Sequence, residues 1–181
     1  MKSTHKILII PGSLRANSST NAVVRAVVSL NSTNLECTVY NGLCNLPHFN
    51  DSDASPEPVQ EFRNLIKATD GVLFCTPEYA FGIPGSLKNA LDWSVSSGEF
   101  SGKPTAVITA ATGGDKAHAA LLLVLSALDA KVVKETTLLL SFIRSKLNDK
   151  NEVKDAATLP AIQSVITALV NIIGDMQAAE N

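Results

Sequence analysis

A short polar segment near the N-terminus holds the residues best suited to bind an anion. Gly12 and Ser13 follow the apolar run 7–10, Arg15 lies two residues further on, and three hydroxyl residues complete the segment: Ser18, Ser19 and Thr20. Hydroxyl groups and an arginine fork bind phosphate oxygens, and a helix that begins here adds unpaired N–H groups. A capped helix after a polar turn would explain the same residues, so this segment alone leaves both interpretations open.

Two well-known nucleotide motifs are absent from the segment. It contains neither GxxxxGK[ST], which cradles the phosphates of a magnesium nucleotide, nor GxGxxG, the dinucleotide fingerprint. We therefore expect a single phosphate monoester here rather than a pyrophosphate.

A second loop combines aromatic, proline and glycine residues after another apolar run, 71–75. Tyr79 and Phe81 could stack on a flat ligand, and the whole loop reads Pro77, Glu78, Tyr79, Ala80, Phe81 and Gly82. A third loop contains Thr112 and Gly113 after the run 105–110 and adds backbone donors. The alternatives are core packing for the aromatic rings and a simple turn for the glycine.

Composition limits the class of protein. The chain has 181 residues, of which 45% are hydrophobic, and a net charge of −2, which predict one domain over residues 1–181 and no nucleic-acid partner. No apolar run approaches the roughly 18–20 residues that cross a bilayer, and no signal peptide is recognisable, so we expect no membrane partner. The three cysteines, an odd number without metal-ligand spacing, predict a cytoplasmic protein and no metal site.

Apolar runs alternate with segments of helical periodicity along the chain. The strand-like runs are 6–10, 35–40, 71–75, 105–110 and 132–140. The helical segments are 18–30, 55–66, 83–95, 115–128 and 159–173. This alternation predicts an α/β fold: a flavodoxin-like three-layer sandwich around a five-stranded parallel sheet in the order 2-1-3-4-5. Segment 43–55 is expected to be a long surface loop.

The predicted strand order brings the first two loops together. Strands 1 and 3 are neighbours at the topological switch point of such a sheet, so the loops that follow them face one crevice. Phosphate-binding groups then lie at one end of the crevice, and aromatic and backbone groups at the other. A flat ring that carries one phosphate would bridge the two ends, and flavin mononucleotide (FMN) has this form.

The same loops carry a family pattern. Gly12-Ser13-Leu14-Arg15, Pro77-Glu78-Tyr79 and the stretch 83–93 together resemble the NADPH-dependent FMN reductase family, which includes bacterial chromate/quinone reductases and azoreductases. The resemblance covers nearly the whole chain. It implies a flavodoxin-like fold with tightly but noncovalently bound FMN, in a homodimer or homotetramer. The phosphate-binding residues that it implies are Ser13, Arg15, Ser18 and Thr20, with Ser19 beside them as a further cofactor-binding candidate.

The resemblance also assigns the flavin ring. The residues that would line it are Pro77, Glu78, Tyr79, Ala80, Phe81, Gly82, Thr112 and Gly113. Many members of the family have Asn at the position of Thr20, and many have Asn-Gly after Pro-Glu-Tyr, where this chain has Ala80-Phe81. The latter loop borders the open face of the ring, so the departure bears on the choice of acceptor.

The predicted function is that of an FMN-dependent NAD(P)H oxidoreductase. NADPH or NADH would pass electrons through FMN to a small acceptor, such as a quinone, an azo compound, a metal oxyanion or free flavin, by a ping-pong mechanism without an acid/base triad. The alternative is a flavodoxin-type electron carrier without substrate turnover, a class that needs a stronger charge patch. We expect His118 to be a structural or interface residue, and Trp93 to anchor a helix to the sheet.

Overall fold

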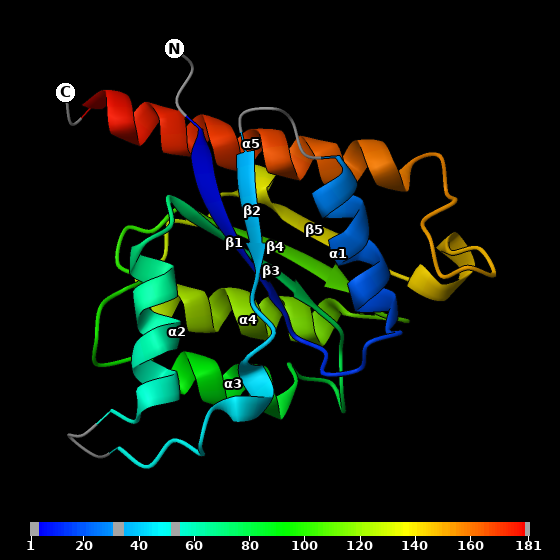
Figure 1. The fold of residues 1–181 in the computed structure, drawn as a ribbon. Helices are drawn as coiled ribbons and strands as arrows, with labels where there is room; N and C mark the ends of the chain where they lie inside the picture. The colour runs from blue at the N-terminus through cyan, green and yellow to red at the C-terminus, as the bar shows by residue number, and fades with distance from the viewer. Residues whose placement is uncertain (1–3, 31–34, 52–54, 180–181) are drawn as a thin grey trace.

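Figure 1 shows a computed structural model of the protein, which describes residues 4–30, 35–51 and 55–179. A five-stranded parallel sheet in the order β2-β1-β3-β4-β5 lies between two layers of helices. The predicted flavodoxin-like architecture is therefore confirmed. The strands are β1 (His5–Pro11), β2 (Leu35–Val39), β3 (Gly71–Thr76), β4 (Thr105–Ala110) and β5 (Thr137–Leu140).

Side chains alternate between the two faces of the sheet, and both faces are apolar. Ile7 and Ile9 of β1 pack toward α1 (Ser19–Ser29) and α5 (Thr158–Ala179), whereas Leu8 and Ile10 pack toward the opposite layer. A strand that is buried on both faces must be apolar at every position, which explains the continuous runs in β1 and β3. The opposite layer consists of α2 (Glu57–Lys67), α3 (Gly85–Asp92) and α4 (Asp115–Ala127).

Helix α5 is longer than the sequence analysis anticipated. Its 22 residues are long and apolar enough to cross a membrane, judged by length and composition alone. In the fold, α5 lies along the sheet on the α1 side (Figure 1), and it buries one stripe against the strands: Ile162, Val165, Ile166, Leu169 and Ile173. It therefore contributes to the core of the domain.

The last strand is shorter than predicted. It begins at Thr137 rather than at residue 132, because Lys134–Thr136 form a 3₁₀ turn. The hydroxyl of Thr136 fixes this turn: it accepts a hydrogen bond from the Val133 amide at 3.2 Å and donates one to the Thr105 carbonyl at 2.9 Å. The second bond joins segments 31 residues apart, so a periodicity argument could not reveal it.

Other boundaries also differ from the prediction. Helix α3 begins at Gly85, after Pro84, and not at residue 83. Segment 43–55 is not only a surface loop, because Leu43 and Leu46 are buried in the core of the α2–α3–α4 layer. Positions 52–54 of this segment lie outside the described residues.

Candidate cofactor site

One pocket lies at the edge of the sheet where the loops after β1, β3 and β4 meet the segment after β5. Its volume is about 110 Å³. Eight predicted site residues line it: Arg15, Ser18, Ser19, Thr20, Pro77, Glu78, Tyr79 and Thr112. The structure thus brings residues from all three predicted loops to one cavity.

The other five predicted residues do not line this pocket: Ser13, Ala80, Phe81, Gly82 and Gly113. Ser13 is buried, and its hydroxyl accepts a hydrogen bond from the Arg15 amide at 3.3 Å. The same hydroxyl lies 3.4 Å from the hydroxyl of Tyr79. Ser13 therefore connects the first loop to the second.

Helix α1 begins at the pocket, and neighbouring side chains cap it. Ser18 is the N-cap, and its hydroxyl accepts a hydrogen bond from the Asn21 amide at 3.1 Å. The side-chain amide of Asn21 donates to the carbonyls of Arg15 and Ala16 at 2.8 and 3.1 Å. The helix is therefore capped, as one interpretation of the segment predicts, and its first residues also line the pocket.

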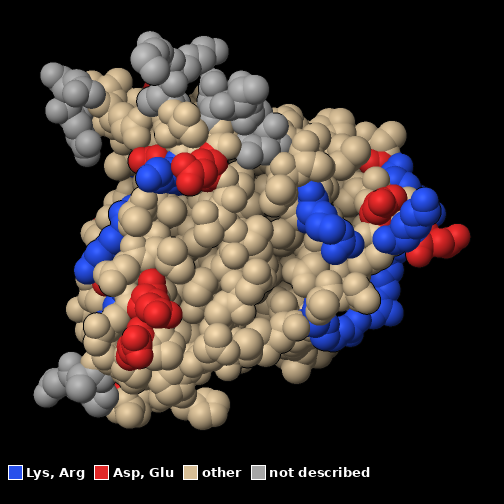
Figure 2. All heavy atoms as spheres, viewed as in Figure 1, with Lys and Arg blue, Asp and Glu red and all other residues tan. Residues whose placement is uncertain are grey.

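Arg15 contributes an unpaired positive charge to the pocket. Its side chain is exposed, and its guanidinium forms no hydrogen bond or ion pair with the residues that the structure describes. Figure 2 shows basic side chains, with acidic side chains among them, at the edge of the molecule where the β1–α1 loop and the segment after β5 lie. A free guanidinium beside a helix N-terminus favours the binding of an anion.

Gly12 has a packing role that the sequence analysis missed. A glycine in a loop that follows a strand can let a ligand approach the backbone closely. Instead, the amide of Gly12 donates to the Cys75 carbonyl at 2.8 Å, and a Cβ atom at this position would lie 2.5 Å from Oγ1 of Thr76. The glycine thus allows the ends of β1 and β3 to approach each other closely, which places the two loops side by side.

The loop after β3 closes on itself as a two-residue hairpin turn. The amide of Tyr79 donates to the carbonyl of Gly82 at 2.9 Å, and the amide of Gly82 donates back at 2.9 Å. Ala80 and Phe81, between them, both have positive φ, at 48° and 59°. Such turns favour Asn-Gly, since non-glycine residues are strained at positive φ. The turn leaves the side chain of Phe81 81% exposed, which excludes core packing for this ring.

Glu78 links the same loop to α4. Its Oε2 accepts a hydrogen bond from the Ala117 amide at 3.0 Å, in the first turn of that helix. Gly114, at the N-cap, has φ +100° and no side chain to cap the helix. The carboxylate therefore supplies the missing cap from another loop and complements the helix dipole.

In the loop after β4, two carbonyl groups accept hydrogen bonds from the segment that follows β5. The carbonyls of Thr112 and Gly113 accept hydrogen bonds from the Phe142 amide at 3.0 Å and from the Ser141 hydroxyl at 2.9 Å. Within the described ranges, the N–H groups of Thr112 and Gly113 have no hydrogen-bond partner. They remain available as donors at the site.

Three other residues, His118, Trp93 and Cys75, lie outside the pocket wall. Nδ1 of His118 is 2.9 Å from the hydroxyl of Thr109, and burial lowers the pKa of the imidazole. Trp93 is buried, and its indole N–H donates to the Pro47 carbonyl at 2.8 Å, as suits a packing anchor. Cys75 is fully buried, and burial raises the pKa of its thiol.

The sequence analysis missed one wall of the pocket. Ile143 and Arg144 line it, in a 3₁₀ segment (Ile143–Lys146) that begins three residues after β5 ends. A signal for them existed, since residues that directly follow any strand of a parallel sheet lie at the same edge as the other carboxyl ends. Ala110 and Ala111, at the end of β4, complete the wall.

Comparison with known proteins identifies the family. Residues 5–144 match the family described as NADPH-dependent FMN reductase, which is well over half of the chain. The chain belongs to the NADPH-dependent FMN reductase family. As a member of this family, the protein is an oxidoreductase with FMN as its cofactor and NAD(P)H as its co-substrate.

Relatives of this FMN reductase cover most of its length. It is 33% identical to a quinone reductase from Pseudomonas putida, over 92% of this chain and 93% of the relative. An NAD(P)H-dependent FMN reductase from Pseudomonas aeruginosa is 30% identical over 91% of this chain and 92% of its own. The solved structure of FerB, a flavoenzyme NAD(P)H:(acceptor) oxidoreductase from Paracoccus denitrificans, matches with a TM-score of 0.76 at 28% identity and covers 95% of this chain and 98% of that one.

The pocket has the donor groups that FMN requires. An unpaired guanidinium, three hydroxyl residues and the start of α1 suit a phosphate, and the free amides after β4 suit ring carbonyl or nitrogen atoms. The side chain of Tyr79 is 47% exposed at the pocket and can contact a ring. Among the residues described, no group of three or more His, Cys, Asp or Glu side chains could hold a metal ion.

Proposed function

We propose that this protein oxidises NAD(P)H and reduces a small acceptor at one FMN-bearing pocket. The observation that carries the proposal is the unpaired Arg15 beside the hydroxyls of α1, in the same cavity as Tyr79 and Thr112. In this assignment Ser13, Arg15, Ser18, Ser19 and Thr20 form the phosphate end. The ring end consists of Pro77, Glu78, Tyr79, Ala80, Phe81, Gly82, Thr112 and Gly113.

The phosphate end is supported by its charge and its preorganisation. A phosphate monoester carries a charge of about −1.5 to −2 at neutral pH. Arg15 provides the opposite charge, and the hydrogen bonds of Asn21 and Ser13 to the backbone of this loop hold its shape before a ligand arrives. Little ordering is then required on binding, which favours affinity.

The ring end is supported by exposed aromatic surface and free donors. When bound, FMN supplies the redox chemistry, the acceptance of a hydride and the release of electrons. The protein contributes orientation: the hairpin at Tyr79–Gly82 holds the aromatic side chains, and the Thr112 and Gly113 amides can stabilise negative charge at the pyrimidine end. No histidine lines the pocket in the described chain, so the side chains here bind and orient without an acid/base triad.

The proposed order of events is ping-pong. The nicotinamide and the acceptor would use in turn the same space beside Tyr79, which lines the pocket. We propose a quinone as the first acceptor to test, because the Pseudomonas putida relative is named a quinone reductase. An azo compound is the second, since a Bacillus relative named NADPH azoreductase is 37% identical over 60% of this chain.

We also propose that residues 1–181 form a single domain that assembles into a homodimer or homotetramer in the cytoplasm. Several large apolar side chains are exposed: Phe81, Val95, Leu123 and Phe142 are 81%, 66%, 74% and 65% accessible. Burial of such side chains in a subunit interface would be favourable. The three cysteines are unpaired, as expected in a reducing compartment.

The function is tested with purified protein loaded with FMN. The visible spectrum should show bound flavin, anaerobic NADPH or NADH should bleach it, and a quinone should restore it. Steady-state rates with both nucleotides against a quinone, an azo dye, a metal oxyanion and free flavin would then rank the acceptors. If neither nucleotide bleaches the bound flavin, the reductase assignment is contradicted and an electron carrier is favoured.

A further inference from the structure

Arg144 lies in the wall of the pocket, in the 3₁₀ segment after β5 and far in sequence from Arg15. The segment is firmly attached to the loop after β4. The amides of Phe142 and Ile143 donate to the carbonyls of Thr112 and Ala111 at 3.0 and 3.1 Å, and the side chain of Ile143 is buried. The backbone of Arg144 is therefore fixed at the pocket, although its side chain is exposed.

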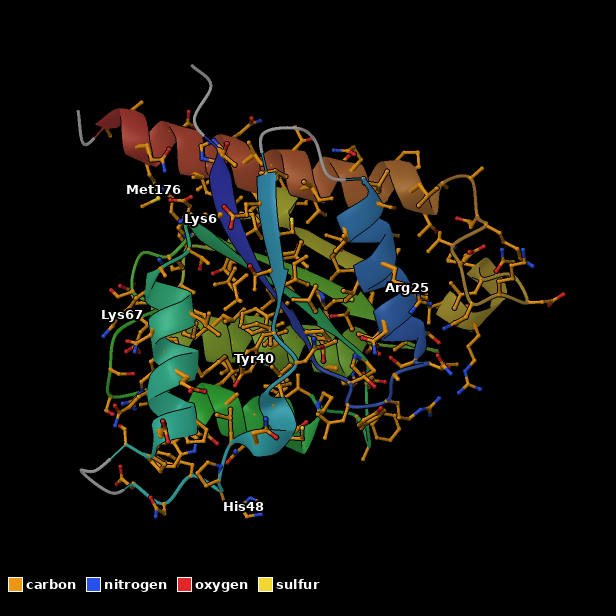
Figure 3. All side chains as sticks on the ribbon, in the orientation of Figure 1. Lys6, Arg25, Tyr40, His48, Lys67 and Met176 are labelled. Carbon is orange, nitrogen blue, oxygen red and sulfur yellow. The ribbon has the colours of Figure 1, made fainter. Side chains whose placement is uncertain are left out.

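The two pocket arginines differ from the other two arginines of the chain. Arg25 projects from α1 toward the segment after β5 (Figure 3) and donates to the Asn151 carbonyl at 2.8 Å. Arg63 donates from Nε to the Trp93 carbonyl at 3.0 Å. The guanidinium groups of Arg15 and Arg144, by contrast, have neither a hydrogen bond nor an ion pair to any described residue.

We propose that Arg144 is a second cationic ligand of the FMN phosphate and forms a two-arginine site with Arg15. This inference rests on the proposed function. Two arginine side chains, which stay protonated at neutral pH, balance the charge of a phosphate monoester, about −1.5 to −2. Glu78 is the one acidic residue of the pocket wall, and its carboxylate already accepts a hydrogen bond from the Ala117 amide. The pair would favour FMN over riboflavin, which shares the ring but has no phosphate.

The test compares FMN with riboflavin, because the ligands differ only at the phosphate. Apoprotein is titrated with each, and flavin fluorescence quenching gives the dissociation constants. Arg144→Gln should raise the Kd for FMN about 10-fold or more, the effect of one lost charge-assisted hydrogen bond, and leave the Kd for riboflavin within about twofold. Arg144→Lys, which keeps the charge, should raise the Kd for FMN less than Arg144→Gln does. Added salt should weaken FMN binding more in the wild type than in Arg144→Gln.

The matched control is Lys150→Gln. It removes one positive charge from an exposed residue of the same region outside the pocket wall, so FMN binding should not change. An unchanged FMN Kd in Arg144→Gln, or an equal loss of FMN and riboflavin affinity, would overturn the assignment. An unchanged FMN Kd with a raised KM for NADPH would place Arg144 at the nucleotide substrate instead. Wild-type apoprotein that binds no FMN would remove the proposed function itself.

Discussion

The loops after β1 and β3 meet at the same pocket but are built in different ways. The β1 loop is held by side-chain hydrogen bonds of Asn21, Ser18 and Ser13, and it leaves the charge of Arg15 free. The β3 loop is held by its own backbone in a strained turn, and it exposes an aromatic ring. The comparison shows that the β1 loop is organised to present a positive charge, whereas the β3 loop is organised to present an exposed aromatic ring.

The largest effect is expected when the unpaired positive charge is removed from the β1 loop. Arg15→Gln should weaken FMN binding by about 1.5–3 kcal/mol, which corresponds to about 10- to 150-fold in Kd. Protein stability should not fall, because the guanidinium has no partner among the described residues. Titration of apoprotein with FMN and a urea unfolding curve measure the two quantities. Unchanged FMN affinity would remove Arg15 from the phosphate end.

The next effect concerns the contact between the loops. Gly12→Ala places a methyl group 2.5 Å from Thr76 Oγ1 and should destabilise the fold by about 1–3 kcal/mol. The loss should shrink in a Thr76→Ala background, which removes the clashing oxygen. Gly85→Ala is the control, since a Cβ there meets nothing within 4 Å. Equal stabilities of Gly12→Ala and the wild type in urea would contradict the close approach of the two strand ends.

Loss of the hydrogen bond between Glu78 and α4 should have a smaller effect. Glu78→Ala removes the acceptor for the Ala117 amide and a negative charge at a helix N-terminus, so it should cost about 1–2 kcal/mol of stability. Glu78→Gln should cost less, because its amide oxygen can still accept the hydrogen bond. Thermal unfolding of apoprotein separates the variants. If the alanine variant melts like the wild type, the carboxylate does not cap α4.

The smallest expected effect is a gain in the stability of the apoprotein. Phe81→Gly relieves the positive φ of 59° and should stabilise the apoprotein by about 0.5–1 kcal/mol, since an exposed ring loses little packing. Phe81→Ala removes the ring but keeps the strained backbone, so its stability should stay near that of the wild type. A destabilised glycine variant would show that the ring of Phe81 has a packing partner, such as a second subunit.

The fold was predictable because its strands are buried on both faces. Continuous apolar runs such as Ile7–Ile10 indicate such strands, and their alternation with helical segments predicts the strand order that is observed. The start of β5 was not predictable, because a hydrogen bond of Thr136 to the distant Thr105 carbonyl sets it. Local patterns do not contain such tertiary contacts.

The lining of the candidate site was predictable where its residues are contiguous in sequence. The loops at 12–20 and 77–82 each form a recognisable motif, and the sheet brings both to one pocket. Arg144 was not predicted, because its segment contains no recognisable motif and only the fold brings this residue to the pocket. The roles of Gly12 and Glu78 escaped for the same reason, since their partners Thr76 and Ala117 belong to other loops or elements.

The most direct test of the account is calorimetric titration of apoprotein with FMN and with riboflavin. If one pocket holds a phosphate at the β1 loop and a ring at the β3 loop, one FMN should bind per chain. Riboflavin should then bind at least about 10-fold more weakly, because it forms none of the charge-assisted contacts at the phosphate end. Equal affinity for the two flavins, or no binding of FMN, would contradict the account.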